Sequence, residues 1–192
     1  MPDLRGHGQS AAPHDPAAYP PDVLVQDAIA LVRHLALGSY DLGGFSLGAR
    51  ITAKLLSDGL KPRKAILAGM GLEGLTGWAK RREFFLTAIA EADSLKRGDR
   101  HWFAAQFMKS QKIDRTAAAL LLHSFTDLDP AGLSRIDTPT LVLCGAEDRD
   151  NGDPASLTQA LGNAQYAEIP GTHMSCIIKP DFGEAIAAWL GR

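Results

Sequence analysis

The sequence predicts an α/β protein in which a mostly parallel sheet carries helices on both faces. Strand-like and helix-like segments alternate along much of the chain. Two apolar runs, 64–70 (KAILAGM) and 140–145 (TLVLCG), are uninterrupted rather than alternating, which is typical of strands that are buried on both faces. A third short strand, 40–45 (YDLGGF), leads directly into Ser46 and a helical pattern, so the order is strand, sharp turn, helix.

Periodicity predicts the remaining elements in order along the chain. Segments 25–36 and 47–55 each carry apolar residues on one helical face, and a glycine follows shortly after each. A further helix is expected near 154–161 and a strand near 164–169 (AQYAEI). The last helix has its apolar face within 182–190. These helices can cover both sides of the sheet.

Residues 72–135 interrupt the alternation, because helical stretches follow one another there without a strand-like run. We therefore expect a core formed by 1–71 and 136–192 and an inserted helical cap formed by 72–135. Seven of the 13 aromatic residues lie in this cap segment. Most buried aromatic side chains serve packing, but this density also predicts an apolar pocket beneath a lid, with Trp78 and Trp102 as candidate lining residues.

Composition narrows the function classes. The chain has 192 residues, 45% of them hydrophobic, which is enough for one domain with a sizeable core. A formal net charge of −2 provides no basic excess for nucleic acid, and no apolar stretch approaches the length of a membrane span. The two cysteines, Cys144 and Cys176, are too few for a disulfide framework. We expect no nucleic acid and no membrane partner, and a cytoplasmic location provided that no signal peptide has been lost.

The chemistry centres on residues 44–48, Gly-Phe-Ser-Leu-Gly, which form a G-x-S-x-G motif between a strand and a helix. In such a turn Ser46 is held clear of the sheet, and Gly44 and Gly48 are expected to let neighbouring backbone pass. The Leu47 amide, at the start of the helix, is a candidate oxyanion donor. A Gly-rich phosphate-binding loop and a purely structural tight turn are the alternatives, and no lysine follows the motif as a phosphate loop would need. Phe45 is a candidate pocket residue.

A serine nucleophile needs a base and a carboxylate that orients the base. The loop after 140–145 contains four acidic residues, namely Glu147, Asp148, Asp150 and Asp153. We expect Asp148 to be the carboxylate. After the strand 164–169 comes a Pro-Gly turn with His173, the expected base, at the same edge of the sheet. Met174, next to it, is a candidate pocket residue. No histidine pair has metal-ligand spacing, so we expect no metal and no cofactor.

Together these motifs resemble the cap-bearing serine hydrolase branch of the α/β-hydrolase superfamily. The resemblance rests on the chain order Ser46, Asp148, His173, on G-x-S-x-G, on Gly145-x-x-Asp148 and on Pro-Gly-x-His. The opening segment 3–10 is similar to the D-x-R-G-H-G-x-S loop of that branch. The residues that match the loop are Asp3, Arg5, Gly6, His7, Gly8 and Ser10. The resemblance implies that His7 shapes the loop near the pocket rather than taking the proton.

The resemblance also implies an N-terminally truncated α/β-hydrolase fold, because in that family strands precede the loop that opens this chain. We therefore expect Met1 to be an internal methionine taken as a start, or the gene to be truncated. The strand that ends at Phe45 would then lie at an open edge of the sheet. The upstream loop would ordinarily supply the second oxyanion donor, and losing one donor lowers the rate by about 10²–10³-fold.

These observations predict a serine hydrolase that cleaves a small, apolar carboxylic ester or lactone through an acyl-enzyme on Ser46. A serine at this position argues against the dehalogenase and epoxide-hydrolase branches, which use aspartate. A cofactor-free perhydrolase and a carbon–carbon bond hydrolase both stay open as enzymes with the same three residues. Outside enzymes, a catalytically silent fragment or ligand-binding module stays open. The sequence leaves the oligomeric state unknown.

Overall fold

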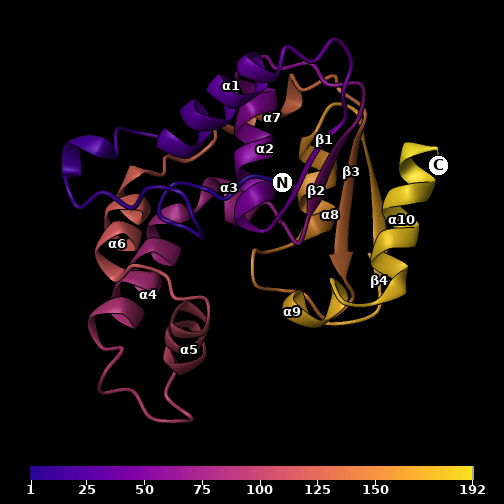
Figure 1. Ribbon diagram of the computed structural model, residues 1–192. Coiled ribbons are helices and arrows are strands. Elements are labelled where there is room, and N and C mark those ends of the chain that lie inside the picture. Colours follow the sequence, from indigo (N-terminus) through magenta and orange to yellow (C-terminus); the bar gives the residue numbers. More distant parts are fainter. Residues whose placement is uncertain (192) are drawn as a thin grey trace. The chain divides into compact units, whose positions relative to one another are not determined.

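A computed structural model describes residues 1–191 of the chain (Figure 1). Arg192, the last residue of the predicted core segment 136–192, lies outside the described residues. The described part contains four strands, which form one parallel sheet in the order β1-β2-β3-β4. The strands are β1 (Leu42–Phe45), β2 (Ala65–Ala68), β3 (Thr140–Gly145) and β4 (Ala164–Ile169). All four predicted strands are confirmed, and the strand before Ser46 is an edge strand, as expected.

The two central strands are the most buried part of the sheet. Every residue of β2 and β3 is buried, as their uninterrupted apolar runs predicted. Side chains alternate between the faces, so that Leu67 and Val142 lie in one apolar cluster and Ile66 and Leu143 lie in the other. The sheet therefore has a core on each face, which is the α/β class that the sequence predicted.

Helices cover both faces of the sheet. On one face α2 (Leu47–Ser57), α7 (Pro130–Ser134) and α8 (Pro154–Ala160) contribute apolar side chains to the cluster around Leu67 and Val142. On the other face α10 (Pro180–Leu190) packs its apolar side against the sheet, and the Trp189 indole N–H donates to the carbonyl of Ala65 at 3.1 Å. In Figure 1, α2 and α10 accordingly lie on opposite sides of the strands.

The chain divides into two compact units. Unit 1 comprises Met1–Ala28 and Trp78–Thr126, and unit 2 comprises Ile29–Gly77 and the chain from Asp127 onward. Unit 2 contains the sheet. The cap predicted at 72–135 contributes 78–126 to unit 1, and its division from the core at 71 and 136 stays a prediction.

Unit 1 is helical among the described residues. Its elements are η1 (Pro16–Ala18), the start of α1 (Val23–Leu35), α4 (Trp78–Ala90), α5 (Trp102–Ser110) and α6 (Arg115–Ser124). The two remaining helices, α3 (Glu73–Thr76) and α9 (His173–Cys176), belong to unit 2. The Asp114 carboxylate accepts from the Ala117 N–H and so caps α6, which fixes where that helix begins. Of the described helices, none combines the length and the apolar character needed to cross a bilayer.

The sheet core gives a first prediction. Leu143 in β3 is fully buried, so Leu143→Ala removes apolar contacts and leaves a cavity. We expect the free energy of unfolding, measured by urea titration, to fall by about 2–5 kcal/mol. Leu37→Ala is the matched control, because Leu37 is 47% exposed and its truncation should change stability by less than about 0.5 kcal/mol. Equal losses in both variants would contradict the assignment of β3 to the core.

Candidate active site

Ser46 stands at a strained turn between β1 and α2. Its φ of 52° and ψ of −111° lie outside the regions that side-chain-bearing residues ordinarily occupy. The Ser46 N–H donates to the carbonyl of Ala68 in β2 at 2.8 Å, and its own carbonyl accepts from Arg50 in α2 at 3.0 Å. The turn is therefore held at both ends. Leu47 is the first residue of α2, so its N–H belongs to the amides that find no acceptor within the helix.

The two glycines of the motif have different roles. A Cβ on Gly44 would collide with the backbone of Gly48 and of Ala49, because β1 and the first turn of α2 nearly touch there. Apart from its two chain neighbours and the backbone of its own helix, no described atom lies within 4 Å of the position that a Cβ on Gly48 would take, and Gly48 has helical backbone. The expectation that both glycines are needed for close backbone approach is therefore wrong for Gly48.

Hydrogen bonds join the loops that follow β3 and β4. Ala146 N–H donates to the carbonyl of Ile169 at 2.8 Å, and Glu147 N–H donates to the carbonyl of Gly171 at 3.0 Å. Gly171 has a φ of 120°, and a Cβ on Gly145 would strike the Gly171 carbonyl, so both positions require glycine. This tight pairing brings Asp148, in the loop after β3, and His173, after β4, close to each other.

The structure brings Ser46, Asp148 and His173 together in unit 2. The distance from His173 Nδ1 to Asp148 Oδ2 is 2.8 Å, and the distance from His173 Nε2 to Ser46 Oγ is 3.0 Å. Because a carboxylate only accepts, Nδ1 carries the proton and donates to Asp148. In the neutral imidazole with this tautomer, Nε2 accepts from the Ser46 hydroxyl. The three predicted residues thus form one hydrogen-bonded chain.

Asp148 is charged although it is buried. Only 4% of its surface is exposed, and burial alone would raise the pKa of its carboxyl. The hydrogen bond and charge of His173 and the N–H of Asp150, 3.1 Å from Oδ1, act in the opposite direction, with a smaller contribution from Arg149. The pKa of Asp148 therefore lies below its ordinary value. A carboxylate in this state keeps the imidazole oriented.

His173 is the first residue of the one-turn helix α9 rather than part of an irregular Pro-Gly loop. Thr172 caps this helix through a capping box with Ser175, whose hydroxyl accepts from the Thr172 N–H at 2.8 Å. We did not predict this helix, although the T-x-x-S spacing was available as a signal. The capping box fixes where α9 begins and so places the backbone of His173 at the start of this helix.

Asn151 is a residue of the site region that the sequence did not indicate. Its buried side-chain amide donates to the carbonyl of Gly69 at 2.7 Å, and its backbone carbonyl accepts from Gly74 N–H at 2.9 Å. The loop that carries Asp148 is thereby tied to the segment after β2. A lone asparagine in an acidic loop gave no signal for this role.

The candidate pocket residues are divided between the two units. In unit 2 the Phe45 ring lies against the His173 imidazole, and Met174 is 53% exposed beside it. In unit 1 the Trp78 indole is buried against Phe125, and Trp102 makes an edge contact with Phe103. Trp78 therefore serves the interior of unit 1.

His7 lies in unit 1, in the segment 3–10, which is held by hydrogen bonds between its own residues. His7 Nδ1 is 3.1 Å from the carbonyl of Arg5, and the Asp3 carboxylate accepts from Gln9 N–H at 2.9 Å. The Arg5 guanidinium donates to both carboxylate oxygens of Asp27 in α1, at 2.7 and 2.9 Å. Two parallel bonds of this kind fix the geometry of the guanidinium, so the segment is anchored to α1.

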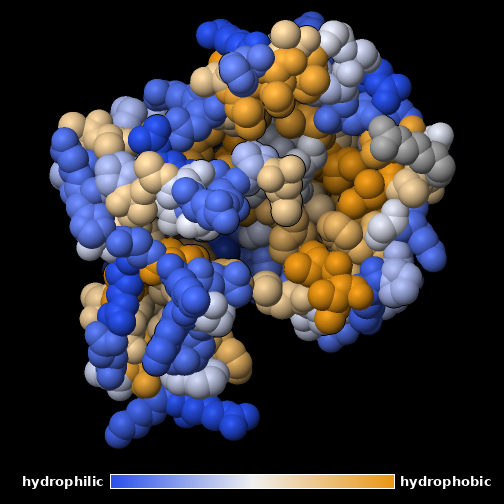
Figure 2. Space-filling model, viewed as in Figure 1, coloured by the Kyte–Doolittle hydropathy of each residue, from blue (hydrophilic) through white to orange (hydrophobic). Residues whose placement is uncertain are grey.

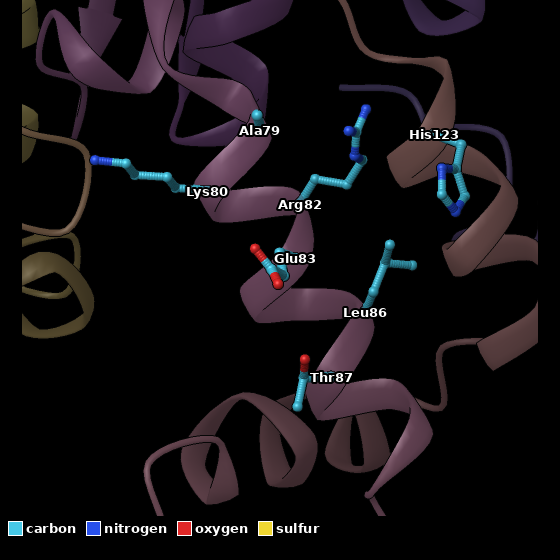
Figure 3. A pocket seen from close by; sticks show the side chains of 7 residues that line it. All are labelled: Ala79, Lys80, Arg82, Glu83, Leu86, Thr87 and His123. Atoms are coloured by element: carbon cyan, nitrogen blue, oxygen red, sulfur yellow. The ribbon is translucent and has the colours of Figure 1, made fainter.

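A cavity of about 410 Å³ lies in unit 1 between α4 and α6 (Figure 3). The residues that line it are Ala79, Lys80, Arg82, Glu83, Leu86, Thr87 and His123. Lys80 and Arg82 extend to opposite sides of α4. His7, Trp78 and Trp102 do not line this cavity. Within residues 1–191, no group of three or more His, Cys, Asp or Glu side chains could hold a metal ion.

Comparison with known proteins gives a family match and structural neighbours. The model of the alpha/beta hydrolase family matches residues 1–188. An esterase from Exiguobacterium antarcticum matches at 19% identity and a TM-score of 0.76, over 99% of this chain and 80% of that chain. An enol-lactonase from Burkholderia xenovorans LB400 matches at 23% identity and a TM-score of 0.72, over 99% and 79%. A bromoperoxidase from Bacillus anthracis matches at 21% identity and a TM-score of 0.68, over 99% and 80%. No curated protein matches the sequence significantly.

The two motif glycines give a second prediction. Gly44→Ala places a methyl group against the backbone of α2, so we expect β1 and α2 to move apart and the free energy of unfolding to fall by about 2 kcal/mol or more. Gly48→Ala is the matched control and should raise it by about 0.5–1 kcal/mol, because alanine favours a helix. Thermal and urea unfolding of both variants and of the wild type measure these changes in the free energy of unfolding. Equal destabilisation by both substitutions would contradict the close approach at Gly44.

The lowered pKa of Asp148 gives a third prediction, a pH dependence of stability. Because the folded pKa lies below the unfolded value of about 3.9, the ionised group stabilises the fold above that pH. This contribution is lost as the pH falls through the folded pKa. We therefore expect Asp148→Asn to lower the free energy of unfolding at pH 7 and the difference from wild type to shrink toward pH 3. Urea titrations at several pH values test this, and a difference that grows in acid would contradict it.

Proposed function

The chain belongs to the alpha/beta hydrolase family, and we propose that it is a serine hydrolase acting on small carboxylic esters or lactones. The observation that carries this proposal is the hydrogen-bonded chain from Ser46 Oγ through His173 to Asp148, at 3.0 and 2.8 Å. The strained backbone at Ser46 supports it further, because strain of this kind concentrates at functional sites.

In the proposed reaction the Ser46 oxygen attacks the acyl carbon while His173 Nε2 takes the hydroxyl proton. The imidazolium that forms is stabilised by the Asp148 carboxylate through its Nδ1–H. The Leu47 N–H, at the start of α2, donates to the oxyanion. His173 then gives its proton to the leaving alkoxide, and the acyl group stays on Ser46. Water then attacks the acyl carbon while His173 Nε2 takes its proton. The bond between the acyl carbon and the Ser46 oxygen breaks, His173 returns the proton to that oxygen, and the carboxylic acid leaves.

An apolar substrate suits the surface around the proposed base. Met174, Ile177 and Ile178 are exposed and lie within five residues after His173 in the chain. Figure 2 shows an apolar patch next to the position of α9. An acyl or alkyl group that covers these side chains would remove apolar surface from water, which stabilises the bound state by roughly 25 cal/mol for each Å² buried. The enol-lactonase and esterase among the structural neighbours agree with an ester or lactone substrate.

Perhydrolysis is the second candidate, in which hydrogen peroxide rather than water accepts the acyl group and a peracid leaves. Two observations favour it over carbon–carbon bond hydrolysis. The Gly-Phe-Ser-Leu-Gly turn resembles the elbow of the cofactor-free perhydrolases, and a bromoperoxidase, whose name implies a peroxide as co-substrate, is among the structural neighbours. The same Ser46 and His173 would act in both ester hydrolysis and perhydrolysis. Measuring peracid and free acid from one ester in the presence of peroxide separates these two reactions.

Labelling with a fluorophosphonate, which reacts with an activated serine, gives a fourth prediction and the test of the proposed function. We expect one adduct by intact mass on the wild-type chain and none on Ser46→Ala. Asp148→Asn should still be labelled, but at a rate lower by about 10³–10⁴-fold, because the imidazole loses the partner that fixes its tautomer.

The labelling experiment also separates an enzyme from a silent binding module. Ser10→Ala is the control, since the Ser10 hydroxyl donates to the Asp3 carbonyl in unit 1 and should not affect labelling. An adduct that persists in Ser46→Ala would place the nucleophile elsewhere. A folded wild-type chain without any adduct would reject the hydrolase proposal in favour of the silent module.

A further inference from the structure

The Phe45 side chain covers one side of the His173 imidazole. The two ring centroids are 4.7 Å apart, and the ring planes are inclined by 34°. Phe45 is the last residue of β1, and its ring packs with the apolar cluster on the α10 face of the sheet. Phe182 of α10 makes an edge contact with it, at 6.1 Å between centroids. The ring is therefore part of the packing around the imidazole.

The backbone at Gly69 leaves room for this ring. Gly69 follows β2 with a φ of 61°, and a Cβ there would lie 2.5 Å from the Phe45 ring. The Gly69 carbonyl is held by the Asn151 amide, so this segment cannot easily withdraw. A glycine at this position and an aromatic residue before Ser46 thus fit each other, and together they determine where the ring lies.

The hydrogen bonds of His173 do little to prevent the imidazole from tilting out of its own plane. His173 is bonded to Asp148 and Ser46 through its two ring nitrogens. The N–H bond and the lone pair of an imidazole point in the plane of the ring, so such bonds resist rotation within that plane more than tilting out of it. A ring packed against one face resists the tilt. An aromatic face within about 6 Å also attracts a cation, and His173 becomes a cation when it takes the serine proton.

We propose that Phe45 is a positioning residue that holds the His173 imidazole toward Ser46 and stabilises its protonated form during acyl transfer. This role rests on the proposed function, since it acts through the base of that reaction. It differs from the pocket role expected from the sequence, because the ring contacts the base and the core cluster.

Phe45→Leu tests this role, since leucine keeps the apolar volume but has no aromatic face. With p-nitrophenyl acetate as the probe, we expect kcat to fall by roughly 3- to 30-fold while KM changes by less than about twofold. Phe182→Leu is the matched control, because it removes a ring from the same cluster that makes no ring contact with His173. It should lower the melting temperature to a similar extent but leave kcat within about twofold of wild type.

The outcomes are distinguishable. An unchanged kcat in Phe45→Leu, or an equal loss in Phe182→Leu, would overturn the role of Phe45 while leaving the hydrolase proposal intact. A folded wild-type chain that neither hydrolyses the ester nor reacts with a fluorophosphonate would overturn the proposed function, and the role of Phe45 with it. If Phe45→Leu does not fold, Phe45→Met takes its place, because a flexible thioether fills the same space without a ring.

Discussion

The backbone of Gly44 lies so close to the first turn of α2 that no side chain fits between them, and this contact sets the direction of Ser46. Ser46 adopts the left-handed φ of 52° that the turn requires, at a cost on the order of 1–3 kcal/mol. The hydrogen bond from Ser46 N–H to the Ala68 carbonyl ties the strained residue to β2. The pairing of β1 with β2 on one side and the packing of α2 on the other therefore maintain the strained backbone of Ser46, which would not be stable in an isolated peptide.

The other two residues of the site depend on the order of the strands. β1 and β4 are separated by two strands, yet His173, which follows β4, reaches the serine that follows β1. This is possible because the carboxyl ends of parallel strands share one edge, over which the chain after β4 can return. The hydrogen bond from the Glu147 N–H to the Gly171 carbonyl joins that returning segment to the loop that carries Asp148. α9, which begins at His173, packs against β3.

Much of this arrangement could be predicted from local patterns. Strand and helix positions agree with the structure to within a few residues, because hydrophobic periodicity depends on near neighbours in the chain. Ser46, Asp148 and His173 could be named because each follows a predicted strand and few residue types suit the chemistry. Asn151 and the helix at His173 escaped prediction, since their roles depend on partners that lie far away in the sequence or on a single capping turn.

The sequence by itself determined the α/β class, the strand that leads into Ser46, and the chain order of the three candidate residues. Only the tertiary structure decided that Gly44 is sterically required and Gly48 is not, and that the Phe45 ring lies against His173. The physical reason is that periodicity shows which face of an element is apolar, whereas the identity of the facing surface depends on long-range packing. The G-x-S-x-G motif shows where the glycines are, but only the position of the neighbouring backbone shows that there is no space for a side chain at Gly44.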